Sequence, residues 1–150
     1  MTDYLTRMAR YNQWVNRQLY DKVELLPAAE IAKDRDAFFG SILGTLNHIL
    51  VGDMFWLRRF ASSKQCKDAL DPIREMTMPS SLRDVLFNDI QMLQSKREEM
   101  DALILNFSAT WNEEILASPI RYRNMAGEKH EQALGALLVS VKATSSTVEI

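Results

Sequence analysis

His48 is the residue of this sequence whose type and setting best suit metal or acid–base chemistry. It lies in an apolar, helix-like segment beside Ile49 and Leu50, where a buried imidazole needs a partner for its ring nitrogens. A metal ion is one such partner. The other histidine is His130 and the one cysteine is Cys66, so a three-histidine site cannot be assembled from this sequence.

Each of these polar side chains also has a structural interpretation. For His48, it is a core histidine hydrogen-bonded to a carboxylate or a backbone carbonyl. His130 lies in a charged stretch where we expect a helix to begin, which favours an exposed side chain that binds no metal. Asp53 interrupts the apolar stripe that follows His48, and we expect it to bond an imidazole or pair with an arginine. His48 and Asp53 could also serve a catalytic serine, but no serine of this sequence lies in a nucleophile-elbow motif.

Cys66 lies between Lys64 and Lys67, whose charges could lower the pKa of a nearby thiol. An ordinary loop thiol is the interpretation that such spacing favours. A single cysteine cannot form an internal disulfide, and it suits a reducing compartment. We therefore expect a cytoplasmic protein.

The composition excludes several classes of function. The 150 residues are 47% apolar and 25% charged, which is typical of one globular domain spanning residues 1–150. The net charge of −2 provides no overall basic field for nucleic acid or anionic lipid. We find no signal peptide, and no apolar run approaches the ~20 residues of a membrane span. We therefore expect no nucleic-acid partner and no membrane partner.

Apolar residues at helical spacing predict four helices, which would position these side chains. Their approximate ranges are 5–26, 41–60, 82–107 and 128–141. Ser81 followed by Asp84 resembles a capping box for the third helix. Asp89 and Lys96 interrupt the apolar stripe of that helix, and we expect them at the edge of a bundle.

Two longer connections separate these helices. Residues 62–78 are polar and contain Pro72, which predicts a crossover, and residues 120–123 alternate like a short strand. Helices joined in this way predict an all-α fold, a four-helix bundle with long crossover connections. Aromatic residues recur at helical spacing, and we expect them in the core rather than as a platform for bases. They are Tyr11, Trp14, Phe55, Trp56 and Phe60.

The end of the fourth helix departs from this pattern. Residues 143–150 are rich in Ser, Thr and Val, which are poor helix formers, so we expect a truncated fourth helix. A short fourth helix would leave the apolar stripes of its neighbours partly uncovered. Either a second chain covers these stripes or a segment is missing.

Two blocks of sequence carry a family resemblance. The first reads RYNQWVNRQLY at residues 10–20, and the second reads FFGS at 38–41 followed by TLNHILVGDMFWL at 45–57. Tyr122, Asn124 and Gly127 extend the likeness weakly. The spacing of these blocks resembles the DinB-like family of metal-dependent enzymes over residues 4–138.

The resemblance implies a four-helix bundle that forms a homodimer and binds a divalent metal, nickel or zinc, through three histidines. His48 occupies the position of the family's second-helix ligand. The other two ligands belong to a fourth-helix motif close to His-Gln-Thr-His-His-Arg-Gly-Gln, which the atypical tail at residues 139–150 lacks. Asn12, Asn16 and Asn47 belong to the family pattern, and we expect them to tie helices together by hydrogen bonds.

A frameshift would explain the missing motif. Reading the codons from Lys142 to Ile150 two bases later permits the peptide Gly-His-Gln-Leu-His-Arg-Gly-Asp. This peptide resembles the motif with one histidine fewer. We therefore hypothesise that a short out-of-frame tail replaces the end of the fourth helix.

Two functional hypotheses follow. The first is a DinB-like metal-dependent enzyme with thiol-dependent transferase or hydrolase-type chemistry on a small molecule, impaired because two of three histidine ligands are absent. In such a site the metal would activate a bound nucleophile. The alternative is a catalytically silent helical bundle that forms a dimer or binds a partner. No catalytic residue is assigned besides the metal ligand His48.

Overall fold

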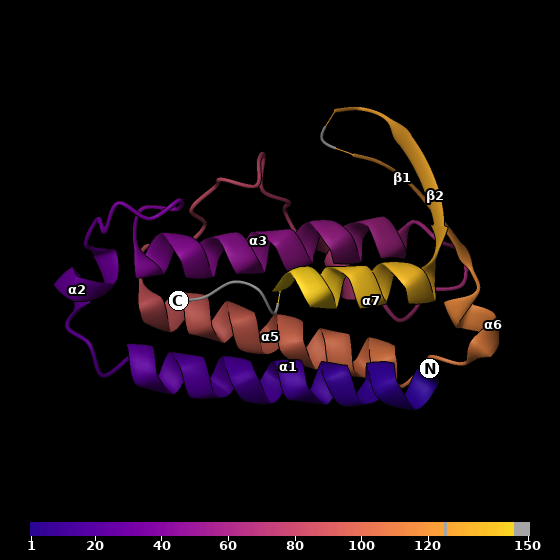
Figure 1. Cartoon of the computed structure of the whole chain (residues 1–150), viewed down its shortest axis with the longest axis horizontal. Helices are drawn as coiled ribbons and strands as arrows, with labels where there is room; N and C mark the ends of the chain where they lie inside the picture. Colours follow the sequence, from indigo (N-terminus) through magenta and orange to yellow (C-terminus); the bar gives the residue numbers. More distant parts are fainter. Residues whose placement is uncertain (125, 146–150) are drawn as a thin grey trace.

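Four long helices lie side by side as a bundle in the computed structural model, which describes residues 1–124 and 126–145 (Figure 1). They are α1 (Thr2–Val23), α3 (Ile42–Ala61), α5 (Ile90–Ser108) and α7 (Leu134–Ser145). The predicted all-α four-helix bundle is therefore confirmed. No helix within the described residues is both long enough and apolar enough to cross a membrane.

Shorter elements join the four long helices. They are α2 (Ala28–Ala32), α4 (Asp71–Glu75), α6 (Glu113–Leu116), β1 (Pro119–Arg123) and β2 (Lys129–Ala133). The two strands pair antiparallel, with Ile120 opposite Gln132 and Tyr122 opposite His130. Figure 1 shows this hairpin standing out from the bundle beside the end of α3. The strand predicted at residues 120–123 is therefore confirmed.

The connection from α3 to α5 runs along the length of the bundle. α3 and α5 point in the same direction in Figure 1, so residues 62–89 must return along the bundle before α5 begins. Leu70 and Ile73 have no exposed surface, and they anchor this segment to the core at α4. The predicted crossover is confirmed, although it contains a buried helical turn and extends to residue 89.

The third long helix begins later than the sequence predicts. Ser81 does bond Asp84, at 3.0 Å, but Asp84 also accepts the backbone N–H of Ser80 at 2.7 Å, which closes a turn. The backbone after this turn is bonded to Asn47 and stays non-helical as far as Asp89. Asp89 then caps α5 by accepting a backbone N–H of the first turn at 2.8 Å. Asp89 is exposed, as an edge position requires, but it lies at the start of the helix and not within its stripe.

The fourth long helix also begins later than predicted. Residues 129–133 pair with β1 as strand β2, instead of forming the first turns of a helix from Glu128. Their sequence, Lys-His-Glu-Gln-Ala, has no apolar stripe, and the hairpin satisfies their backbone hydrogen bonds. The described part of α7 runs from Leu134 into the predicted atypical tail, whose positions 143–145 are helical, contrary to the expectation that the helix ends before them. It includes Ser145, and the rest of the predicted tail, residues 146–150, lies outside the described residues.

A charged cluster occupies the centre of the bundle. Arg97 of α5 is only 2% exposed, and its Nη2 lies 2.8 Å from Asp53 of α3 and 2.7 Å from Asp101 of α5. Asp101 also accepts hydrogen bonds from the side-chain amides of Asn12 and Asn16 on α1, at 3.0–3.1 Å. The cluster thus joins three helices. The structural roles predicted for Asp53 and for these asparagines are confirmed.

Burial and charge act in opposite directions within this cluster. Burial raises the pKa of the Asp101 carboxyl above its ordinary value, although Arg97 and Asn16 oppose the rise. Burial also disfavours the charge of Arg97, but Asp53 and Asp101 outweigh it and raise the pKa of the guanidinium. Each charge is therefore stable in the core only while its partners are present.

Two aromatic residues predicted in the core lie on the surface instead. Tyr11 and Trp14 are each 56% exposed on the outward face of α1, where their ring centroids lie 6.0 Å apart. The prediction holds for Phe60, which is buried, and in part for Phe55 and Trp56, which are half-buried. The prediction fails for Tyr11 and Trp14 because the face of α1 that meets the charged cluster carries Asn12 and Asn16 instead.

Replacing Arg97 with methionine should lower the free energy of unfolding by about 3–5 kcal/mol, because two carboxylates would remain buried without their cation. Urea denaturation followed by circular dichroism measures this loss. The matched control is Lys96→Gln on the same helix, whose partner Glu99 is exposed and lies 3.4 Å away. There we expect a change below about 1 kcal/mol. Equal losses for the two variants would contradict a central role for the cluster.

Candidate functional site

His48 lies near the start of α3, where the chain turns tightly into the helix. Ser41 caps this helix by accepting the Gly44 N–H at 2.9 Å. Gly44 is required here because a Cβ at this position would collide with the carbonyl oxygen of Phe39. The close approach brings the Phe39 ring over His48, with ring centroids 3.8 Å apart and ring planes 17° from parallel.

The imidazole of His48 is half-buried and bonded through one nitrogen. Its Nδ1 lies 2.9 Å from the backbone carbonyl oxygen of Leu82, in the crossover. Because a carbonyl oxygen can only accept, Nδ1 carries the hydrogen and the neutral ring has its lone pair on Nε2. The structural interpretation of a histidine bonded to a backbone carbonyl is therefore confirmed. The same tautomer leaves Nε2 in the form that binds a metal.

The ligands that would complete a metal site with His48 are not found in the described part of the chain. Within residues 1–124 and 126–145, no three His, Cys, Asp or Glu side chains are grouped so that they could hold one ion. The sequence of residues 139–150 contains no histidine or cysteine. His48 therefore fits the position of one ligand, but the residues present do not fit a three-histidine centre.

Two adjoining cavities lie at the end of the bundle near His48. The first, of about 310 Å³, is lined in part by Phe39 and Asp34, and the second, of about 470 Å³, is lined in part by Asp89. Residues shared by both linings are Ala32, Leu43 and Asn88. Phe39 therefore contacts both the imidazole and a cavity of small-molecule size. No sequence pattern had indicated this role of Phe39, although the glycine that follows it is a signal for a turn.

Cys66 is not suited to be a nucleophile. Its side chain is buried, and burial raises the pKa of the thiol above its ordinary value, although a hydrogen bond with Ser63 opposes the rise. Lys64 and Lys67 are exposed and do not reverse this effect. The structure therefore supports an unreactive thiol, and it contradicts the alternative in which the two lysines lower the pKa.

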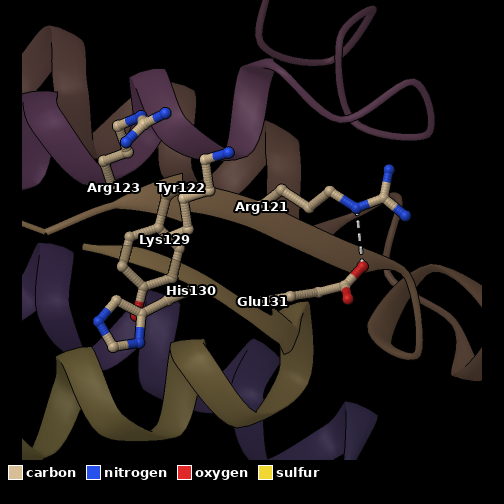
Figure 2. Close-up of a pocket in the computed structure, with 6 residues that line it drawn as sticks. All are labelled: Arg121, Tyr122, Arg123, Lys129, His130 and Glu131. Carbon is tan, nitrogen blue, oxygen red and sulfur yellow. Dashed lines mark hydrogen bonds and ion pairs between the residues drawn. The ribbon is translucent and has the colours of Figure 1, made fainter. Parts of the chain in front are cut away.

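His130 lies on the exposed hairpin and not at the start of a helix. Its Nε2 accepts from the side-chain amide of Asn124 at 3.1 Å, and its ring stacks on Tyr122 with centroids 5.5 Å apart. A cavity of about 490 Å³ opens beside these rings. Figure 2 shows the six residues that line it, Arg121, Tyr122, Arg123, Lys129, His130 and Glu131. The exposure predicted for His130 is confirmed, and its predicted place in a helix is wrong.

Arg59 joins this hairpin to α3. Its guanidinium lies 4.6 Å from the ring centroid of Trp56 and 5.0 Å from that of Tyr122. Its Nη2 also donates to the backbone carbonyl of Arg123 at 3.2 Å. Burial lowers the pKa of Arg59, and Tyr122 offsets part of this effect. Stacking and a hydrogen bond therefore hold the hairpin against the end of the bundle.

Comparison with known proteins adds to this geometry. The DinB family matches residues 1–139 of the chain. Protein DinB of Bacillus subtilis (strain 168) is 24% identical over 146 residues, which cover 94% of this chain and 77% of that protein. No solved structure matches the chain significantly. The family match ends at residue 139, where the atypical tail begins.

The two histidines should differ in their effect on stability. His48→Ala should lower the free energy of unfolding by about 1–3 kcal/mol, because it removes a partly buried hydrogen bond and leaves the Leu82 carbonyl without its donor. His130→Ala is the matched control, and its exposed ring should contribute less than about 1 kcal/mol. Urea denaturation of the two variants measures the difference. A smaller loss for His48→Ala than for His130→Ala would contradict the geometry at Leu82.

Proposed function

The chain belongs to the DinB family, as the blocks around Asn12 and His48 predict, and on that premise we propose that it is a divalent-metal-dependent enzyme. Its expected chemistry is that of a thiol-dependent transferase or a hydrolase-type enzyme acting on a small molecule, with nickel or zinc as the metal. His48 is the ligand that this chain retains. Because the residues present do not complete a three-histidine set, we propose that the activity is impaired.

One observation carries this proposal, the contact of 2.9 Å between His48 Nδ1 and the carbonyl oxygen of Leu82. Histidines that bind metals almost always donate their other ring N–H to such an oxygen, which fixes the tautomer and the ring orientation. The Phe39 ring restrains the imidazole further, at a centroid distance of 3.8 Å. His48 thus has the supporting contacts that a metal ligand needs, and the cavity lined by Phe39 is available for a small substrate.

The incomplete ligand set agrees with the limits of the family match. The match ends at residue 139, and the residues that follow contain no histidine. We propose that a frameshift near codon 142 replaced the ligand-bearing turn of the fourth helix. Reading the gene from codon 139 past its stop codon tests this directly. A second frame that encodes two histidines and Arg-Gly supports the frameshift, and a frame without them contradicts it.

Added Ni²⁺ or Zn²⁺ should bind this chain weakly, and His48→Ala should weaken that binding by about tenfold or more. Mutation of the group that hydrogen-bonds a metal ligand typically lowers metal affinity by about 10–100-fold. Removal of the ligand itself should lower the affinity by at least as much. Equilibrium dialysis followed by metal analysis measures the affinity. His130→Ala is the control, and it should leave the affinity unchanged. Equal binding by the original chain and by His48→Ala would exclude His48 as a ligand.

We further propose that the protein is a homodimer, as its family membership implies. Tyr4, Tyr11 and Trp14 are more than half exposed on α1, and Arg7 lies between them on the same face. Trp, Tyr and Arg are the residues most enriched at the centres of protein interfaces. This face of α1 therefore supports association with a second chain.

Trp14→Glu should convert the dimer to a monomer at micromolar concentration, because it replaces a large aromatic contact of this face with a charge. Sedimentation velocity measures the change. Leu25→Glu is the matched control, since Leu25 is 85% exposed but lies beyond the end of α1. We expect that variant to remain dimeric. If the unsubstituted protein sediments as a monomer, the proposed homodimer is wrong.

A further inference from the structure

Two like charges face each other at the turn end of the hairpin. Arg123 of β1 and Lys129 of β2 are directly opposite in the strand register, and both side chains are exposed. Directly opposed like charges destabilise an antiparallel pair. Neither side chain has an ion pair with a carboxylate among the described residues. Arg123 instead donates to the backbone carbonyl of Gly127 at 3.0 Å.

The neighbouring cross-strand pair is the opposite case. Arg121 and Glu131 face each other in the register and form an ion pair at 2.8 Å. Figure 2 shows this pair joined by a dashed line, while Arg123 and Lys129 extend to one side of the hairpin farther along the strands. The one carboxylate in the cavity lining is therefore already neutralised, and the cavity keeps two cationic groups without a counter-charge.

A third cation reaches the same end of the hairpin. Arg59 donates to the backbone carbonyl of Arg123 and stacks on the Tyr122 ring. Because side chains alternate along a strand, Arg59 approaches from the face that carries Tyr122, opposite to the face of Arg123 and Lys129. Arg59 therefore adds to the positive field of the hairpin, and it does not occupy the space between Arg123 and Lys129 where a ligand would lie. No carboxylate in the described part of the chain pairs with Arg59.

The remaining acidic residue of the hairpin is engaged elsewhere. Glu128 accepts from the side-chain amide of Asn124 at 3.1 Å and lies 3.7 Å from Nε2 of His130. Asn124 also binds the backbone N–H of Glu128 at 2.9 Å, which fixes the turn. The turn therefore directs this carboxylate toward Asn124 and His130, and the hairpin stays locally positive in a chain whose net charge is −2.

We propose that the hairpin cavity binds a small organic anion, with its phosphate or carboxylate group held between the Arg123 guanidinium and the Lys129 ammonium. An arginine can bind such a group through two parallel hydrogen bonds, and a lysine adds a point charge. The cavity volume of about 490 Å³ lies in the range of small-molecule sites. Tyr122 and His130 complete the lining of the cavity, and their rings stack on each other on the other face of the hairpin. This site is separate from His48 and does not rest on the proposed metal chemistry.

Isothermal titration of the full chain with phenyl phosphate, and separately with benzoate, tests the site. Lys129→Glu should weaken binding of the preferred anion by roughly tenfold or more, because it removes a charged donor and gives Arg123 a carboxylate partner. The same change should keep or raise the melting temperature, since it replaces a like-charge pair by an opposite-charge pair. Tighter binding of phenyl phosphate supports a phosphate ligand, and tighter binding of benzoate supports a carboxylate ligand.

Lys33→Glu is the matched control, since it makes the same change in net charge beyond α2, at the opposite end of the bundle (Figure 1). It should change the affinity by less than about twofold. Arg123→Gln provides a second test of the site and should also weaken binding. The proposal is overturned if neither anion binds the original chain at millimolar concentration. It is equally overturned if Lys129→Glu and Lys33→Glu weaken binding by the same factor.

Discussion

The guanidinium of Arg97 is buried between two carboxylates, and the relative positions of the long helices depend on this contact. Arg97 and Asp101 belong to α5, Asp53 belongs to α3, and two asparagines of α1 complete the hydrogen bonding of Asp101. A shift of any of these helices along its axis would leave a charge in the core without its partner, at a cost of several kcal/mol. An apolar core tolerates such shifts more readily, because apolar contacts are not directional. The cluster therefore sets the register of α1, α3 and α5.

The two candidate sites lie toward opposite ends of the helix that this cluster holds. His48 is near the start of α3, where Phe39 and the crossover enclose it, and Arg59 is near its end, where the hairpin packs. Asp53 lies between them and ties α3 to α5. One rigid helix thus positions both a potential metal ligand and a cationic hairpin. The two sites share a scaffold, but no described residue belongs to both.

Much of the bundle could be predicted from the sequence, because α1 and α3 carry long apolar stripes and α3 begins at a capping serine. The starts of the last two long helices could not. Residues 82–86 have helical spacing, but Asn47, about 40 residues earlier, binds the backbone of Leu86 and Phe87, and the segment is not helical. β2 has no alternating apolar pattern, so only its pairing with β1 identifies it as a strand. His48 was identified from its apolar setting, whereas its partner is a backbone carbonyl 34 residues away, which no side-chain pattern reveals.

Asn47 and His48 together attach the crossover to α3. Asn47 accepts the N–H groups of Leu86 and Phe87 and donates to the Phe87 carbonyl, while His48 holds the Leu82 carbonyl. The four bonds come from two consecutive residues of one helix, so we expect the segment from 82 to 87 to open as a single cooperative unit. Amide hydrogen exchange at Leu86 and Phe87 therefore reports on this opening separately from global unfolding. The same opening event frees Nδ1 of the imidazole, so the tautomer of His48 is coupled to the local stability of a loop.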